Sequence, residues 1–395
     1  MIDIAVIGSG FGGAVIAARL GAAARASNPG AQVVLLERGE DPTGRFDARS
    51  LGPPLNADGN RFRNSFAPDY LSTLAELFTD TEGRFKQNSP SMTVATGRAL
   101  GGGSQVYDGV SLRAPSLAFD QSREQRRLWP SRYSRALLDP FYARVEARLK
   151  VRQLAWTSAS APSWALATRR DYLFAEGCRR IGATAVPLKV ADDSDANEGW
   201  WNEGQRLSGR QSLTQNYLLD AQAAGVTFQT GCTIDTVSPI AGGYRLDGTD
   251  ARTGTPLQLD CKLVVVAGGA VGSTGLLLRS KDAFSGSRAL DPNGALGKHL
   301  SANGDYGVTG TVGDELGDVL GFEGKPMSSF CPSYFQQHQF ILIPFYAAPL
   351  YLALGQFASL LKPEQPGATG RGFDERRRRR ARLGPRLQAA AEDLR

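Results

Sequence analysis

The residues with the clearest capacity for chemistry are glycines near the N-terminus. Residues 8–13 read Gly-Ser-Gly-Phe-Gly-Gly, a GxGxxG pattern, and an acidic residue, Glu37, follows downstream. Glycines at this spacing let the backbone approach a pyrophosphate, which the amide groups at the start of a helix can bind. A carboxylate nearby accepts hydrogen bonds from ribose hydroxyls and disfavours a ribose that carries a 2′-phosphate. The pattern therefore favours FAD or NAD over NADP.

A strand, a helix and a second strand must hold these residues in place. Residues 4–7 are apolar and typical of a buried parallel strand, and the alanine-rich residues 14–25 predict a helix. Residues 32–36 predict a second strand, which Glu37 ends. The first glycine of the pattern permits the turn, the second admits the pyrophosphate, and the last lets helix and strand pack closely. We predict a dinucleotide site here; an isolated glycine-rich turn is the alternative.

A second glycine-rich segment spans residues 97–110. Three consecutive glycines, 101–103, leave the backbone without side chains, which suits close approach to a flat ring system or a diphosphate. Apolar Leu100, Val106 and Val110 flank these glycines, which favours an ordered, buried segment over a flexible surface loop.

Together the two segments resemble the glucose–methanol–choline (GMC) family of flavin oxidoreductases, specifically its cholesterol-oxidase-like branch. Residues 3–13 are similar to the family's FAD fingerprint, and 97–110 to its second signature, which passes beside the isoalloxazine. The family often has an asparagine where Tyr107 stands. The resemblance extends to about residue 350. Its later pieces are a strand bordering the adenine (225–234), a strand–turn–helix under the cofactor (264–274) and a loop re-entering the substrate domain (296–305).

The resemblance and the glycine patterns together assign FAD as cofactor and give a set of cofactor-binding residues, with no metal site. These residues are Gly8, Gly10, Phe11, Gly12, Gly13, Glu37, Arg38, Arg98, Gly102, Gly103, Ser104, Tyr107, Asp108, Gly109, Ile234, Ala267 and Gly268.

No catalytic residue is assigned. The family uses a histidine near the C-terminus as the base, with an asparagine or a second histidine nearby. This chain has two histidines, His299 and His338, and neither stands in that context. His299 is the nearer candidate base, and a surface or helix-capping role is its alternative.

The expected fold class is α/β, with a Rossmann-like FAD-binding domain and a discontinuous α+β substrate domain. The FAD-binding domain takes residues 1–50, 95–115 and 220–305; the substrate domain takes 51–94, 116–219 and 306–361; and 362–395 form a basic tail. Apolar residues at helical spacing in 134–150 predict an amphipathic helix. The resemblance implies a further FAD-binding segment beyond residue 361, so we expect both domains to be C-terminally incomplete.

Residues 340–361 contain no charge and are long enough to span a bilayer. Pro344 and Pro349 argue against a simple spanning helix, so we predict a strand plus a buried or interfacial apolar segment. A transmembrane helix and an unsupported hydrophobic end are the alternatives. The net charge of +6 is concentrated in the tail around Arg376–Arg380. We predict a solvated tail; attraction to anionic lipid and nucleic-acid binding are alternatives.

The composition fits a folded, multidomain chain. With 395 residues, 42% of them hydrophobic and 21% charged, it excludes a largely disordered chain, a collagen and a coiled coil. Four scattered cysteines exclude a disulfide framework and a metal site of their own, so we expect them reduced. The N-terminus lacks a signal-peptide pattern. We therefore expect a cytoplasmic protein. Peripheral membrane contact through residues 340–361 is the alternative.

The leading functional hypothesis is an FAD-dependent oxidoreductase acting on CH–OH donors. It would transfer a hydride from a bulky, hydrophobic, sterol-like alcohol to flavin N5 and pass the electrons to an unknown acceptor. The expected partner is thus a small hydrophobic alcohol and not nucleic acid. The alternatives are a catalytically impaired FAD-binding fragment of such an enzyme and an NAD-linked dehydrogenase.

Overall fold

The computed structural model describes the two glycine segments and most of the chain between residues 96 and 301. The described residues are 1–41, 43–49, 78–79, 96–105, 107–123, 126–127, 129–154, 168–193, 209–301, 313, 315, 319, 325 and 327–345. The predictions for residues 51–77, 346–361 and 362–395 lie outside them.

A six-stranded sheet forms the centre of the fold, in the order β10-β2-β1-β13-β12-β11. The four strands β10, β2, β1 and β13 are parallel, and β12 and β11 continue the sheet antiparallel. The strands are β1 (Ile2–Ile7), β2 (Val33–Leu36), β10 (Thr227–Gln229), β11 (Cys232–Ile240), β12 (Gly243–Asp250) and β13 (Pro256–Val266). The expected mixed α/β fold with a parallel sheet is confirmed.

The predicted strand–helix–strand unit at the N-terminus is also confirmed. β1 runs into α1 (Phe11–Ser27), and the chain returns in β2, which pairs parallel with β1. The second predicted unit holds too, since β13 leads into α7 (Gly269–Ser280). Both units bring a helix N-terminus to the carboxyl edge of the parallel strands, where α/β proteins bind their ligands.

Residues 225–234 were expected to form one strand, and this expectation is wrong. Gly231 adopts φ +68° and turns the chain, so β10 and β11 are separate strands at opposite edges of the sheet. The main chain of Glu37 binds both sides of the turn, donating to the carbonyl of Gln229 (2.9 Å) and accepting from the amide of Cys232 (2.8 Å).

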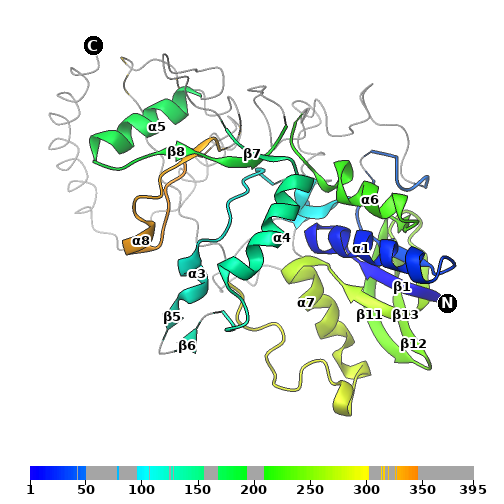
Figure 1. The fold of residues 1–395 in the computed structure, drawn as a ribbon. Helices are drawn as coiled ribbons and strands as arrows, with labels where there is room; N and C mark the ends of the chain where they lie inside the picture. Colours follow the sequence, from blue (N-terminus) through cyan, green and yellow to red (C-terminus); the bar gives the residue numbers. More distant parts are fainter. Residues whose placement is uncertain are drawn as a thin grey trace, which may run out of the picture.

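One face of the sheet packs against α1 and α6 (Tyr217–Ala223), as Figure 1 shows. Val6 and Leu35 point to this side, where the small residues Ala14 and Ala17 of α1 let the helix approach closely. Leu213–Gln215 (η2), which we placed in the substrate domain, and α6, which the predicted boundary at residue 220 divides, join this core through Leu213 and Leu218. This core therefore includes residues on both sides of position 220.

The opposite set of strand residues forms a second apolar cluster. Ala5 and Leu36 alternate with Val6 and Leu35 along their strands, as the two-residue period of a strand requires. They pack with residues of β11, β12, β13 and α7, among them Leu276. The sheet is therefore covered on both sides, which explains its apolar parallel strands.

A second group of shorter elements lies beside this core (Figure 1). Its helices are α3 (Ser116–Asp120), α4 (Arg135–Arg148), α5 (Arg169–Arg180) and α8 (Phe335–His338). Its strand pairs are β7 (Val151–Gln153) with β9 (Lys189–Ala191), β8 (Val186–Pro187) with β14 (Ser329–Phe330), β5 (Ser122–Arg123) with β6 (Arg126–Arg127), and β3 (Phe78–Thr79) with β4 (Thr96–Gly97).

Helix α4 confirms the predicted helix but leaves part of its apolar stripe exposed. The Ser134 side chain caps it by accepting from the amide of Leu137 (3.2 Å). Leu149, just past its end, is buried, whereas Leu137 and Phe141 are 52% and 54% exposed. Helical spacing thus gave the element correctly but not its burial.

The four cysteines are free and buried, as expected. Burial raises the pKa of both Cys178 and Cys261 to about 11. Among the described residues, no helix has both the length and the apolar character needed to cross a membrane. Of the apolar stretch 340–361, the described part includes Leu342, which forms a bridge with Cys331.

Candidate dinucleotide site

The first glycine segment makes the turn from β1 into α1. Gly8 adopts φ +98°, and a Cβ there would lie 2.5 Å from the carbonyl oxygen of Ala267. A Cβ on Gly13 would overlap the Gly8 carbonyl oxygen. Gly10 and Gly12 differ, because a Cβ on either meets no protein atom within 4 Å. The fold itself requires two of the four glycines, and the other two border open space.

That open space lies at the N-terminus of α1. Gly10 is the N-cap residue and supplies no side-chain cap, and the first turn of the helix contains no acidic residue. Amide groups at a helix N-terminus lack partners within the helix and attract anions. The turn therefore fits a pyrophosphate, with Gly10 and Gly12 on its approach path.

Glu37 follows β2 at the same edge and is only 6% exposed. Its Oε2 accepts from the amide (3.1 Å) and the hydroxyl (2.5 Å) of Ser9, and its Oε1 accepts from the amide of Gly39 (2.9 Å). Burial raises the pKa of Glu37 above its ordinary value, against the opposing effect of these hydrogen bonds. Oε2 thus accepts two hydrogen bonds, whereas Oε1 accepts one and keeps a second acceptor position, so ribose binding by Glu37 stays a prediction.

The second glycine segment packs directly on the first. The amide of Gly101 donates to the Ser9 hydroxyl (2.9 Å), and a Cβ on Gly102 would lie 2.9 Å from the Gly10 Cα. Ser9 thus connects Glu37 with the second segment, a role that our sequence analysis did not assign to it. The signal available was its polar side chain inside an otherwise apolar and glycine-rich turn.

The end of the second segment carries Tyr107, Asp108 and Gly109. The ring of Tyr107 meets that of Phe11 edge-on, with centroids 5.3 Å apart. Its hydroxyl donates to the carbonyl of Gln211 (2.8 Å), and burial raises the pKa of Tyr107 to about 12. These contacts bring together Phe11 and Tyr107, two of the predicted binding residues, from remote parts of the chain.

Other predicted residues fall into three positions. Ala267 and Gly268 form the β13–α7 turn beside Gly8, and Ser104 is buried, donating to the carbonyl of Gly101 (2.8 Å). Arg38, Arg98 and Gly103 are exposed. Ile234 is buried in the cluster that includes Ala5 and Leu246, on β11. The structure thus gathers the glycine segments at one edge, while Ile234 packs in the second apolar cluster.

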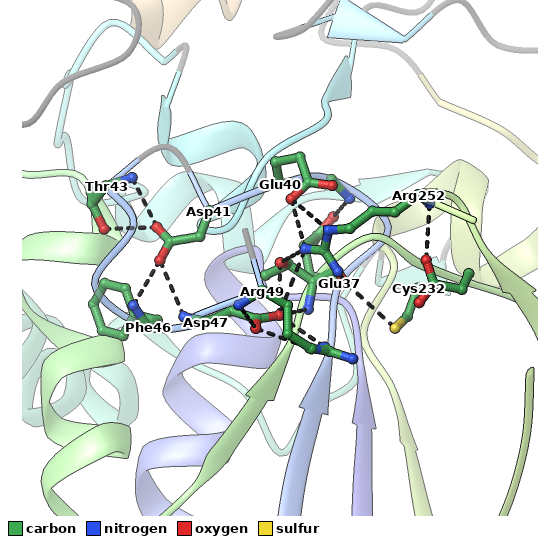
Figure 2. Close-up of polar contacts among 12 residues, drawn as sticks. Glu37, Glu40, Asp41, Thr43, Phe46, Asp47, Arg49, Cys232 and Arg252 are labelled. Carbon is green, nitrogen blue, oxygen red and sulfur yellow. Dashed lines mark hydrogen bonds and ion pairs between the residues drawn. The ribbon is translucent and has the colours of Figure 1, made fainter. Parts of the chain in front are cut away.

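A polar loop follows Glu37 and closes this edge of the sheet (Figure 2). Asp41 is buried and accepts from the amide (2.9 Å) and hydroxyl (2.7 Å) of Thr43 and from the amide of Phe46 (2.7 Å). The main-chain carbonyl of Glu40 accepts from the amide of Leu100 (2.8 Å), which joins the loop to the second glycine segment. Side-chain bonds thus fix the course of the chain beyond the carboxylate.

Two arginines tie the same loop to the β10–β11 turn (Figure 2). Asp47 accepts from Arg49 Nη2 (2.9 Å) and from the amide of Thr230 (2.7 Å), while Arg252 Nη2 donates to Glu40 (2.7 Å). Burial alone would raise the pKa of Asp47, but the hydrogen bonds from Arg49 and Thr230 together hold that pKa well below its ordinary value. The sequence analysis missed this network, because its members are spread over three segments.

Neither histidine contributes to this edge through a contact that the structure reveals. His299 is exposed on the loop after α7, with φ +63°. His338 ends α8 and stacks on Phe340 with ring centroids 6.0 Å apart. In the described part of the chain, no group of His, Cys, Asp and Glu residues could hold a metal ion.

The parallel strands, the glycine turn at a helix N-terminus and the carboxylate after β2 define a dinucleotide-binding α/β protein. Residues 5–300 match the sequence profile of the GMC oxidoreductase family. This match spans well over half of the chain, so the chain belongs to the GMC oxidoreductase family. Its cofactor is FAD, which the open, glycine-lined turn fits.

Curated relatives match most of this chain but less than half of their own length. A GMC-type oxidoreductase of Mycobacterium tuberculosis (strain ATCC 25618 / H37Rv) is 29% identical over 280 residues, covering 70% of this chain and 39% of that protein. The long-chain-alcohol oxidase FAO3 of Arabidopsis thaliana is 22% identical over 336 residues, or 82% of this chain and 39% of that protein. The chain thus spans about two-fifths of the length of these relatives.

Solved structures also align with part of this chain, at lower sequence identity. A fungal aryl-alcohol oxidase aligns with TM-score 0.41 and 14% identity, covering 71% of this chain and 48% of its own. A formate oxidase variant of Aspergillus oryzae aligns with TM-score 0.44 and 14% identity, covering 71% of this chain and 47% of its own.

Proposed function

We propose that this chain forms the FAD-binding part of an oxidoreductase that oxidises the CH–OH group of a hydrophobic alcohol. The observation that carries the proposal is the contact between the two glycine segments. Gly102 lies against Gly10 at the N-terminus of α1, with Glu37 beside them. A cofactor bound there would extend along the second segment toward the shorter elements around β9.

The residues of the chain would bind and orient the cofactor. The first-turn amides of α1 would hold the pyrophosphate, and Glu37 would accept from the adenosine ribose. The peptide groups around Tyr107 would border the flavin half. Bound FAD supplies the hydride acceptor, flavin N5, that alcohol oxidation requires.

For the substrate, we propose a bulky, apolar alcohol. The likeness of the two glycine segments to the cholesterol-oxidase-like branch supports a sterol-like alcohol, and the name of the Arabidopsis relative supports a long-chain one. Both alcohols are hydrophobic, so an assay must compare them. A cytoplasmic location and the absence of a nucleic-acid partner stay predictions, and no electron acceptor is assigned.

The test is turnover by the purified, FAD-loaded chain with an artificial electron acceptor. Sterols, long-chain primary alcohols and short alcohols are assayed in parallel at equal concentration. Reduction of the acceptor that depends on a hydrophobic alcohol supports the proposal. If none of these alcohols bleaches the flavin absorption under anaerobic conditions, the proposal is contradicted.

A second candidate function is FAD binding without alcohol oxidation. The positions of the two histidines favour it, since His299 is exposed and His338 stacks on Phe340. Loss of a general base costs about 10²–10⁴ in rate. Stoichiometric FAD binding with no flavin reduction would support this candidate, and replacing His299 by alanine would then leave every measured property unchanged.

A further inference from the structure

Arg210 is a buried arginine that the dinucleotide site described above does not use. It is 1% exposed, and its guanidinium lies under the second glycine segment. Nη1 donates to the main-chain carbonyl of Tyr107 (2.7 Å), and Nη2 donates to that of Gln105. The guanidinium carbon also lies 5.8 Å from the centroid of the Tyr107 ring. One side chain therefore holds two peptide groups of the same short segment.

The charge on Arg210 persists in spite of its burial. Burial lowers the pKa of Arg210 to about 10, which still leaves the guanidinium protonated at neutral pH. A buried charge is costly unless hydrogen bonds satisfy it. Here the main-chain carbonyls of Gln105 and Tyr107 accept those bonds, so the geometry of the glycine segment and the burial of Arg210 depend on each other.

The strand β9 fixes Arg210 from its other side. Residues Asp192 and Arg210 form a bridge, and the amide of Gln211 donates to the carbonyl of Ala191 (2.9 Å). The amide of Ala191 in turn donates to the carbonyl of Gly109 (2.7 Å). The main chain of β9 thus links the segment around Arg210 to the second glycine segment.

Two glycines of the second segment, Gly101 and Gly109, bond to different parts of the fold. Gly101 bonds to Ser9, next to Glu37, at the edge where the adenosine half lies in this fold. Gly109 bonds to β9, away from that carboxylate. The pyrophosphate occupies the N-terminus of α1, between the two ends. Tyr107, Asp108 and Gly109 consequently lie on the side toward which the flavin half would extend.

Arg210 also sets the direction of the peptide groups there. The described peptide bonds are all trans, so a carbonyl and the amide that follows it point in opposite directions. Because the Tyr107 carbonyl is turned toward Arg210, the amide of Asp108 points away from Arg210. Rotating this peptide group would break the bond to Nη1.

We propose that Arg210 is a positioning residue for the flavin half of FAD. Its guanidinium fork fixes the carbonyls of Gln105 and Tyr107, and the peptide groups so oriented form the surface that borders the flavin ring system. The inference rests on the FAD-binding part of the proposed function and is independent of alcohol oxidation. It separates the flavin half of the site, which needs Arg210, from the adenosine half, which does not.

The experiment compares the affinities of FAD and ADP for the full 395-residue chain and its Arg210→Lys and Arg210→Met variants. ADP contains the adenosine and pyrophosphate parts but no flavin. We expect FAD affinity to fall about tenfold in Arg210→Lys and about 100-fold in Arg210→Met, because a charge-assisted bond is lost with each step. ADP affinity stays within about twofold of the parental value. The visible circular dichroism of the bound flavin decreases in the same order.

Arg245 provides the matched control. Its fork binds Asp260 (2.9 and 3.1 Å) on the β12–β13 hairpin, so Arg245→Lys and Arg245→Met make the same chemical change far from the glycine segments. Both should leave FAD affinity unchanged. Should Arg210→Met fail to fold, Arg210→Lys carries the test, because it keeps the charge and removes the fork that binds both carbonyls.

Equal losses of FAD and ADP affinity in the Arg210 variants would overturn the inference and leave Arg210 as general structural support. Unchanged FAD affinity and an unchanged flavin dichroism would overturn it as well, as would failure of the parental chain to bind FAD. A parental chain that binds FAD and oxidises no alcohol, with variants that still separate FAD from ADP, would refute the proposed function and leave the inference standing.

Discussion

The two glycine-rich segments reach the same edge of the sheet by different means. The first, residues 8–13, joins β1 to the first turn of α1 and takes its shape chiefly from immediate neighbours: Gly8 has φ +98°, and Gly13 faces the Gly8 carbonyl. The second, residues 97–110, is held by residues that are remote in the sequence. Arg210 binds two of its carbonyls, and further bonds come from the segment around it and from β9.

This difference separates local from remote determinants of one cofactor site. A strand–turn–helix encodes the first segment, so a single glycine there can be needed for the fold or for the ligand, but seldom for both. At residues 101–103 the second segment has no side chains with which to define its course. Its position therefore depends on whatever packs beneath it, and substitutions far away in sequence should affect cofactor binding.

The largest effect should come from Gly13→Ala, which tests the local determinant. The added Cβ would overlap the Gly8 carbonyl oxygen, a backbone atom that cannot move aside. We expect a loss of about 4–5 kcal/mol or more in the free energy of unfolding, measured by urea denaturation of the FAD-free chain. Gly12→Ala is the control, since its Cβ meets no protein atom within 4 Å. Equal stability of the two variants would show that α1 can shift away from β1.

Gly10→Val should separate the cofactor from the fold. Gly10 has φ −64°, which valine tolerates, and no protein atom lies within 4 Å of its Cβ position. We expect parental stability but FAD affinity weakened about 100-fold or more, because the side chain would occupy the path of the pyrophosphate. Fluorescence titration with FAD, together with thermal unfolding, measures both. Parental affinity in this variant would place the pyrophosphate elsewhere.

Glu37→Ala should have a smaller effect on both properties. Loss of charge-assisted bonds to the ribose should weaken FAD binding by about 1–3 kcal/mol. The buried amides of Ser9 and Gly39 also lose their acceptor, so stability should fall as well. Ser9→Ala is the comparison, because it keeps the carboxylate and removes both bonds of the hydroxyl, the one to Glu37 and the one from the Gly101 amide. An unchanged dissociation constant for FAD in Glu37→Ala would mean that the carboxylate serves the protein alone.

The smallest effect concerns the polar loop behind Glu37. The pKa of Asp47 is depressed in the folded chain, so its stabilising contribution is complete above its unfolded pKa of about 3.9 and is lost as pH falls below that value. Asp47→Asn should lower the free energy of unfolding at pH 7 by about 1–2 kcal/mol. Urea denaturation at pH 7, 4 and 3 should show this difference shrinking toward acid pH. A difference that is constant across this range would contradict the assignment.

The sequence predicted the elements that depend on local pattern. The apolar strand 4–7, the helix after it and the carboxylate after the second strand all appear where expected, as does the strand–turn–helix around Gly268. Each is a short unit whose residue types define its own geometry. The helix at 134–150 also formed, but the exposure of Phe141 could not be foreseen, because burial depends on what packs against a face.

The parts that sequence reasoning missed involve pairs of remote residues. The division of residues 225–234 at Gly231 depends on Glu37, whose main chain binds both sides of the turn. Arg210 stands in a polar stretch that offers no pattern, and only the fold brings it under Tyr107. Asp47 likewise acquires its partners from another segment, at Thr230.

By itself, the sequence determined a dinucleotide-binding turn, its preference for a cofactor without a 2′-phosphate, and the resemblance to a flavoprotein family. These follow from glycine positions and from strand and helix periodicity, which act over a few residues. The tertiary structure decided which glycines the fold requires, what supports the second segment, and where Ile234, His299 and Arg210 lie. Such features depend on contacts between distant parts of the chain, and these contacts form only when the chain folds.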